Sequence, residues 1–373
     1  MSYSHRRDAL RQGAIQVFTI GAILAMLWLV ASLVRQRLEA MGINTGFAFL
    51  SHRAGYDLGE SLIPYDGDSS YGRALLAGFS NTLKVALSSI FVALALGLIA
   101  AGAMLSGHAS ANRVARFYIR TVRNTPLLLQ LFFWFGVFTI SLPGIRERIT
   151  LLPGVYLSNR GLNFPTPDAT MWAFIAVTVV TLAATTVAHR HLRNRGKNTI
   201  VLRYIGWGVG LALVPLAATL DFAAFNMPEA GRFAIKGGGV LTPEFMTLFF
   251  GLSIYTGTYI AEVLRGAVQA VAEGQSEAAG ALGLTRLQSF RLVVLPQATR
   301  IALPSTVSEL LNLVKNSSLG VAVGYPDLVS AGNTAMNQTG QAIEMISIYM
   351  VAYVAINVVI TKFSKMLEAR YEW

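Results

Sequence analysis

Residue types that commonly carry catalysis are sparse in this chain and do not cluster. Among 373 residues there is no cysteine, which excludes thiol catalysis, disulfides and thiolate metal sites. The five histidines are scattered, and His189 and His191 lie in a basic stretch where solvated side chains are expected. A membrane-embedded enzyme would need His, Asp, Glu or Cys gathered at one depth, and the sequence shows no such grouping. We therefore expect a non-catalytic chain that holds no metal.

Several ionisable residues instead interrupt apolar stretches. Such side chains are costly at membrane depth and usually face the interior of a helix bundle. Glu262 and Arg265 have the i, i+3 spacing of an ion pair on one helix face, although they could also extend to the membrane interface. Lys84 is a further such residue. Glu309 and Lys315, with Asn312 and Asn316 beside them, would either line a pathway or hold two helices together.

The composition indicates an integral membrane protein. Hydrophobic residues make up 54% of the chain, and charged residues make up 13%, which is about half the share in a soluble domain. A large apolar α/β enzyme is excluded because the apolar runs are about 20 residues long and alternate with basic loops. The net charge of +11 then marks cytoplasmic loops that set orientation, and nucleic acid is not expected as a partner.

The hydropathy pattern predicts an all-α integral membrane protein with about eight membrane-spanning helices and both termini in the cytoplasm. The basic loops 107–125 and 189–203 are assigned to the inside, and the charge-balanced loop 35–80 to the outside. The first apolar run is too long for a signal peptide and has no clean cleavage site. The predicted spans are residues 17–34, 82–105, 126–140, 171–188, 200–220, 242–264, 301–323 and 342–361.

A polar, small-residue-rich stretch, residues 273–296, lies between the sixth and seventh predicted spans. It predicts two short helices joined by a turn at Gly283 and Leu284, on the cytoplasmic side. Glycine permits the positive φ that such a turn requires. The stretch contains no residues for chemistry of its own, so we expect a surface that a partner grips.

This stretch resembles the EAA loop of ABC importer membrane subunits. Three residues separate the triplet 277–279 from Gly283, and nine more precede the Val293-x-Leu295-Pro296 end, with Val in place of the usual Ile. Other stretches are similar to polar amino acid permeases: 81–83, 123–130, 255–267 and 313–319. Residues 332–334 and 337–341, with the long insertions 35–80 and 141–241, resemble the general L-amino-acid permeases of Gram-negative bacteria. The resemblance covers roughly residues 70–373.

The resemblance implies a type I importer (MetI-like) core of five helices, the second, third, sixth, seventh and eighth spans. An N-terminal helix and a two-helix insertion would be added to it. The expected parts are a tail and first helix (1–34), a periplasmic loop (35–80) and a permease domain (81–365) with its coupling loop at 266–300. The chain would lie in the bacterial inner membrane in contact with lipid. Its implied partners are an ATP-binding subunit dimer, a second homologous permease and a periplasmic amino-acid-binding protein. ATP and Mg would bind the ATPase, so no cofactor is expected on this chain.

Two sets of site residues follow from the resemblance. The ATPase-coupling set is Glu273, Ser276, Glu277, Ala278, Ala279, Gly283 and Leu284. A zwitterionic amino acid needs donors for its carboxylate and acceptors for its ammonium, which helix ends near the midplane can supply. The expected pathway lining is Tyr255, Thr256, Thr258, Asn312, Lys315, Ser317, Ser318 and Gln338, although hydrogen bonding between helices is an alternative role. A self-contained secondary transporter or channel is the alternative function, but it would need no coupling loop.

Overall fold

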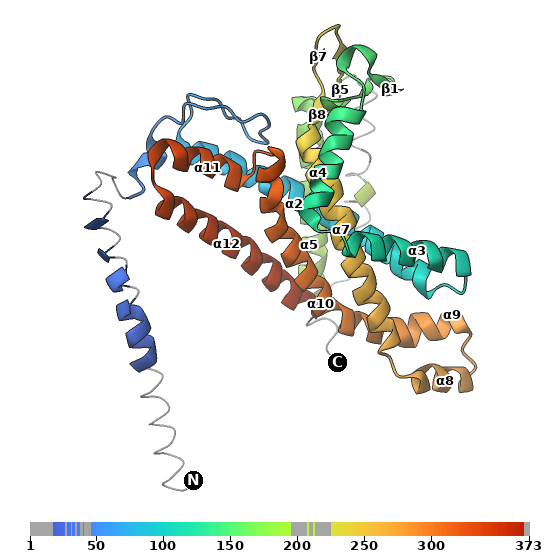
Figure 1. Cartoon of the computed structure of the whole chain (residues 1–373). Coiled ribbons are helices and arrows are strands. Elements are labelled where there is room, and N and C mark those ends of the chain that lie inside the picture. Colours follow the sequence, from blue (N-terminus) through green and yellow to red (C-terminus); the bar gives the residue numbers. More distant parts are fainter. Residues whose placement is uncertain are drawn as a thin grey trace. The chain divides into compact units, whose positions relative to one another are not determined.

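A computed structural model of the chain describes residues 46–194 and 225–368, together with residues 18–26, 28–30, 32–33, 36, 37, 40, 207, 208 and 212. The described chain is mainly helical (Figure 1). It forms two compact units, Met1–Phe91 with Ile260–Trp373, and Val92–Tyr259. Helices α2 and α7 each run from one unit into the other.

Within the described part of the chain, three helices are long and apolar enough to cross a membrane: α2 (Tyr71–Leu105), α7 (Pro243–Gln269) and α12 (Ala342–Glu368). They contain the second, sixth and eighth predicted spans. At a rise of about 1.5 Å per residue, each exceeds the roughly 30 Å thickness of the hydrocarbon layer. In the first unit, α12 packs against α10 (Leu295–Asn316) and α11 (Leu328–Thr339).

The third predicted span is one arm of a bent helix pair. Helix α3 (Ala109–Arg123) meets α4 (Leu127–Gly136), continued by the π-helical turn η2 (Val137–Ser141), at an angle of 101°. Pro126 precedes α4, where its missing N–H costs no helix bond. The basic stretch 107–125 was expected as a loop. It forms α3 because its arginines recur at helical spacing opposite the buried Ala115 and Ile119.

The expected count of about eight spans is not confirmed. The described residues hold three long apolar helices, or four if the bent pair counts as one span. The predicted span 171–188 lies in α5 (Ala169–Asn194), whose apolar part is short. The predicted span 301–323 covers most of α10 and the 3-10 helix η5 (Ser317–Val323) that follows it. Pro304 lies inside α10 without ending it. The predicted span 200–220 falls almost entirely outside the described residues, and 17–34 is described only in part.

A small β layer in the second unit accompanies the helices. Strands β1 (Ile149–Leu152), β2 (Val155–Ser158), β3 (Gly161–Phe164) and β8 (Gly239–Leu241) form an antiparallel sheet in that order. Two short pairs join β4 (Thr166–Pro167) to β5 (Phe225–Asn226) and β6 (Glu229–Ala230) to β7 (Ile235–Lys236). The 3-10 turn η3 (Ile145–Glu147) leads into β1. The sequence predicted external insertions here, but not their strands.

Residues 46–70, here called the strap, form an ordered segment before α2. The 3-10 turn η1 (Ala48–Ser51) buries Phe49 against Tyr71, with ring centroids 5.9 Å apart. Phe49 and Ala54 belong to a buried cluster with residues of α2, α11 and α12. The predicted external loop is therefore fixed to the first unit by apolar packing.

Candidate functional site

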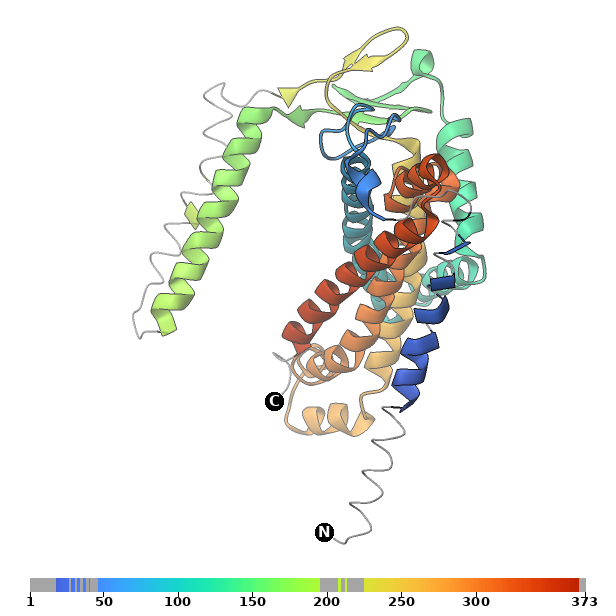
Figure 2. The ribbon, with the colours of Figure 1, turned by 90° about the vertical axis from the view of Figure 1, so that its left-hand side faces the viewer.

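The stretch singled out by the sequence forms a helical hairpin between α7 and α10. Helix α8 (Glu273–Ala281) and helix α9 (Arg286–Ser289) follow α7, and the π-helical turn η4 (Phe290–Val294) leads into α10. The prediction of two short helices with a turn at Gly283 is confirmed. Figure 2 shows this hairpin beyond the ends of α7 and α10. From here on, the name coupling loop refers to the hairpin itself, residues 270–294 of the predicted 266–300.

Two capping motifs hold the turn of the coupling loop. The amide of Gly283 donates to the carbonyl oxygen of Gly280 at 2.9 Å, and that of Leu284 donates to Ala279 at 3.1 Å. These are the two bonds of a Schellman cap, and Gly283 supplies the left-handed residue with φ +80°. Thr285 then begins α9 with a capping box. The backbone amide of Gln288 donates to the Thr285 hydroxyl, and the backbone amide of Thr285 donates to the side-chain oxygen of Gln288. One helix ends and the next begins within four residues, so the hairpin has little freedom.

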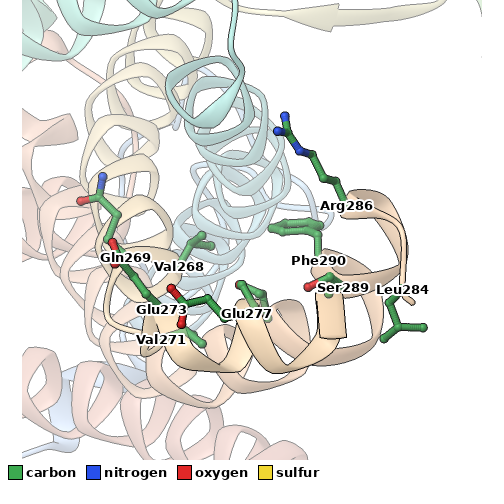
Figure 3. A pocket seen from close by; sticks show the side chains of 12 residues that line it. Val268, Gln269, Val271, Glu273, Glu277, Leu284, Arg286, Ser289 and Phe290 are labelled. Atoms are coloured by element: carbon green, nitrogen blue, oxygen red, sulfur yellow. The ribbon is translucent and has the colours of Figure 1, made fainter. Parts of the chain in front are cut away.

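A pocket of about 780 Å³ lies in the concave side of the coupling loop. Figure 3 shows Glu273 and Glu277 extending from α8 on one side and Arg286 and Phe290 from α9 and η4 on the other. The two carboxylates are one helical turn apart, so they line the same wall. The remaining lining residues are Val268, Gln269, Val271, Ser276, Gly280, Leu284, Ser289 and Val294. The pocket therefore combines an acidic wall with an apolar floor.

The seven predicted coupling residues take different places in this geometry. Glu273, Ser276, Glu277 and Leu284 line the pocket, while Gly283 forms the turn. Ala279 is 3% exposed on the side where α8 packs on η4, whereas Ala278 faces outward. A small residue at 279 lets the two arms of the hairpin approach closely.

Two exposed leucines at the tip of the coupling loop were missed by the sequence reasoning. Leu282 is 82% exposed and Leu287 is 75% exposed. Exposed apolar side chains on a polar, rigid hairpin are typical of a surface that a partner covers. In the sequence, Leu282 directly precedes the turn residue Gly283, and Leu287 follows the capping residue Thr285 by two positions.

Polar contacts brace the base of the coupling loop. Arg265 donates to the Glu262 carboxylate at 2.8 Å and 2.6 Å, and to the Gln269 side-chain oxygen at 2.5 Å. The predicted i, i+3 ion pair is thus confirmed. Gln297 of α10 donates to Gln275 of α8 at 3.2 Å. The Gln297–Gln275 bond ties the hairpin to α10, whereas the contacts of Arg265 lie within the last turns of α7.

The predicted pathway residues fall into two groups. On α7, Thr256 and Thr258 are buried, and the Tyr255 and Tyr259 hydroxyls lie 3.0 Å apart. In the first unit, Ser317 is buried and donates to the Val314 carbonyl, whereas Asn312, Lys315 and Gln338 are exposed. The Ser318 hydroxyl donates to the Lys315 carbonyl, and the Tyr71 hydroxyl donates to the Gln338 side chain. Their role in substrate passage stays a prediction.

Comparison with known proteins now assigns the chain. The family model described as "Binding-protein-dependent transport system inner membrane component" matches residues 93–373. The chain belongs to this family. The match covers the bent helix pair, the β layer, the coupling loop and α10 to α12. Among the described residues, no group of three His, Cys, Asp or Glu could hold a metal ion.

Members of the family with similar length resemble the chain almost from end to end. It is 41% identical to the "General L-amino acid transport system permease protein AapQ" of Rhizobium johnstonii, over 95% of this chain and 90% of that one. It is 37% identical to the "Putative amino-acid ABC transporter permease protein YhdX" of Escherichia coli, over 99% and 96%. It is 32% identical to the "Glutamate/glutamine/aspartate/asparagine transport system permease protein BztB" of Rhodobacter capsulatus, over 95% and 92%.

Solved structures with a similar fold are more distant in sequence. An amino acid ABC transporter crystallised with histidines is 21% identical, with a TM-score of 0.49 over 80% of this chain and 95% of the other. The MetNI methionine ABC transporter, in an inward-facing conformation, is 15% identical, with a TM-score of 0.46 over 81% and 98%.

Proposed function

We propose that this chain is the permease subunit of an ATP-driven importer of polar L-amino acids in the bacterial inner membrane. The observation that carries the proposal is the rigid, exposed coupling loop with its EAA-type spacing, in a chain of the inner membrane component family. Three relatives that align over nearly their full length are named as amino acid transporters. They support amino acids as the substrate class.

The coupling loop is the docking site for an ATPase subunit. Leu282 and Leu287 would enter an apolar groove on the ATPase, and the acidic wall at Glu273 and Glu277 would meet donors there. Because both ends of the loop continue into long helices, a displacement of the hairpin moves α7 and α10 together. ATP-driven closure of an ATPase pair would in this way switch the pathway between outward and inward access.

The remaining subunits complete the proposed assembly. Two ATP-binding subunits carry ATP and Mg, a second homologous permease lies beside this chain, and an extracytoplasmic amino-acid-binding protein delivers the substrate. Hydrolysis occurs in the partner, so this chain contributes no catalytic residue. Both termini and the coupling loop face the cytoplasm in this arrangement.

Purification of the tagged chain from its own membrane tests the proposal. We expect an ATPase and a second permease to co-purify, and the chain alone to show no ATPase activity. Leu282→Asp places a charge on the proposed contact and should remove the ATPase from the preparation. Leu62→Asp, at a 59% exposed leucine of the strap, is the matched control and should retain it. A lone chain that transports amino acids without an ATPase would favour a secondary transporter and overturn the proposal.

A further inference from the structure

One side of α3 is strongly basic and is not used by the proposed function. The helix contains four arginines and no acidic residue: Arg113, Arg116, Arg120 and Arg123. Arg113 lies four residues before Phe117 and Arg120 lies three residues after it, so the three side chains share one stripe of the helix. Arg116 is exposed beside this stripe, and Phe117 itself is 71% exposed. We call Arg113, Arg116, Phe117 and Arg120 the basic face.

The opposite side of α3 packs against the rest of the second unit. Ala115 and Ile119 are buried on this side. The Tyr118 hydroxyl donates to the carbonyl oxygen of Ile254 on α7 at 2.7 Å. These contacts set the rotation of α3 about its own axis, so the basic face points away from the protein that supports the helix.

A contact with α7 places the end of α3 near one edge of the hydrocarbon layer. Residues 245–261 of α7 contain no charged residue, and at about 1.5 Å per residue they span roughly 26 Å, close to the thickness of that layer. The Arg123 guanidinium lies 4.8 Å from the centre of the Tyr259 ring, three residues before Glu262 ends the uncharged stretch. Since the arginines of α3 assign this edge to the cytoplasm, α3 lies at the inner head groups.

The bend between α3 and α4 turns α3 along the membrane surface. The two helices meet at 101°, and Figure 1 shows α3 extending sideways from α4. Residues 127–141, which form α4 and η2, carry no charge and suit the hydrocarbon layer, whereas arginines are costly at that depth. With α4 across the layer, α3 lies close to the membrane plane. Its basic face can then meet the lipid head groups along the length of the helix.

The charge of the basic face is not neutralised within the described part of the chain. No described carboxylate lies within ion-pair distance of Arg113, Arg116 or Arg120. Arg116 instead donates to the neutral side-chain oxygen of Asn112 at 2.6 Å. Guanidinium groups form charge-assisted hydrogen bonds with phosphate, and an exposed aromatic ring among them suits the region beneath the head groups. A surface of anionic phospholipids offers both environments to the basic face.

We propose that the basic face binds the phosphate groups of anionic phospholipids in the cytoplasmic leaflet, with the Phe117 ring inserted between them. Such binding lies beyond the proposed transport function and adds a lipid partner that holds the bend between α3 and α4 in place. Arginine suits this role because its guanidinium bridges two phosphate oxygens while its methylene stem stays beside the acyl chains. The basic face selects lipids by head-group charge and does not distinguish their fatty acids.

Fluorescence quenching beside the basic face tests the proposal. The chain contains no cysteine, so Thr121→Cys, at an exposed position of α3, gives one site for a fluorophore in this subunit. The assembled transporter, with the cysteines of its other subunits replaced, is placed in phosphatidylcholine vesicles that contain nitroxide-labelled lipid. Labelled phosphatidylglycerol should quench with an apparent affinity about 5-fold or more above that of labelled phosphatidylcholine, since one arginine near an anionic surface contributes roughly that factor. The measurement requires no transport, so its failure is distinguishable from a failure of the proposed function.

Two triple variants show whether the preference comes from the charge of the basic face. With Arg113→Gln, Arg116→Gln and Arg120→Gln together, the two labelled lipids should quench equally. Lysine at the same three positions keeps the charge and should keep a preference for phosphatidylglycerol. A full preference in the glutamine variant would overturn the proposal, and so would its loss in the lysine variant.

A control with the same change of net charge addresses the protein as a whole. Arg146→Gln, Arg160→Gln and Arg232→Gln together remove three exposed arginines from the β layer and its turns, and this variant should keep the full preference. Equal quenching by the two lipids without any arginine substitution would overturn the proposal. If the glutamine variant of the basic face instead lost the ATPase subunit, with no lipid preference before the substitution, the face would belong to that subunit.

Discussion

At Gly283 the backbone adopts φ +80°, and no heavy atom lies within 4 Å of the place where a Cβ would stand. The restriction is therefore conformational, since a side chain would have space but not a favourable backbone angle. An alanine in this region costs about 1 kcal/mol or more relative to glycine. The Schellman cap depends on this one residue, because both of its bonds require the left-handed turn.

Gly283→Ala should accordingly loosen the coupling loop and reduce uptake. We expect amide hydrogen exchange in α8 to accelerate roughly 10-fold, the factor that about 1.4 kcal/mol of local destabilisation produces. Gly280→Ala, three residues earlier in α8, is the control, since its Cβ also meets no atom within 4 Å and its backbone is helical. It should slow exchange in α8 or leave it unchanged. Equal exchange in the two variants would contradict the conformational role of Gly283.

Short spacing along the chain made the residues of the coupling loop predictable. The turn at Gly283 and the Glu262–Arg265 pair depend on contacts within a few residues, and the structure contains both. Lys84 was recognised as an ion in an apolar run, but its partner was not, because Glu60 lies in a loop with other acids and no local signal distinguishes it. The Asn81 contact with Pro326 spans a still longer separation. Contacts of this kind are set by the fold and leave no periodic pattern in the sequence.

Helices α2 and α11 approach each other at Gly78. A Cβ there would lie 2.7 Å from the carbonyl oxygen of Asp327 and 3.0 Å from the Ala331 side chain. Both neighbours are fully or almost fully buried and belong to α11 or its start, so they have little room to move. The absence of a side chain at this position lets the backbones come together, as is common between membrane helices.

Gly78→Ala should therefore destabilise the first unit by about 1–3 kcal/mol, the usual range for overpacking. Gly102→Ala lies in the same helix, has no neighbour within 4 Å and serves as the matched control. Thermal unfolding of the purified complex in detergent would compare the two, and only Gly78→Ala should lower the midpoint by several degrees. An unfolding midpoint equal to that of the wild type would show that α2 and α11 can move apart at Gly78 to accommodate the added methyl group.

The β layer shows how far elements could be predicted from sequence. Its first hairpin turns at Pro153-Gly154, with Gly154 at φ +78°, and the second turns before Gly161 at φ +110°. Both are ordinary turn signals that sequence reasoning could have used. The pairing of β3 with β8 could not be found in this way, because α5 and the long insertion separate them in sequence. Amphipathic α3 was similarly hidden because its arginines were assigned to a loop.

For the molecule as a whole, α7 is the element that links distant parts. Leu241 ends β8, Pro243 begins α7, and the coupling loop follows directly after Gln269. A helix of 27 residues is roughly 40 Å long, which is enough to cross the hydrocarbon layer once. The alternation of spans predicted from the basic loops assigns residues 141–170 to the outside and the coupling loop to the inside.

The natural absence of cysteine makes the topology directly measurable. Single cysteines at Gly274 in the coupling loop, Gly144 before the β layer and Gly59 in the strap all fall where no heavy atom lies within 4 Å of an added Cβ. In intact cells a membrane-impermeant maleimide should label Gly144→Cys and Gly59→Cys but not Gly274→Cys, because the alternation of the predicted spans, oriented by the basic loops, places the coupling loop in the cytoplasm. Asn198→Cys, outside the described residues, decides the number of spans. Labelling only after permeabilisation would agree with two membrane crossings by the insertion, 171–188 and 200–220, and with about eight spans in all. Labelling in intact cells would contradict both of these crossings.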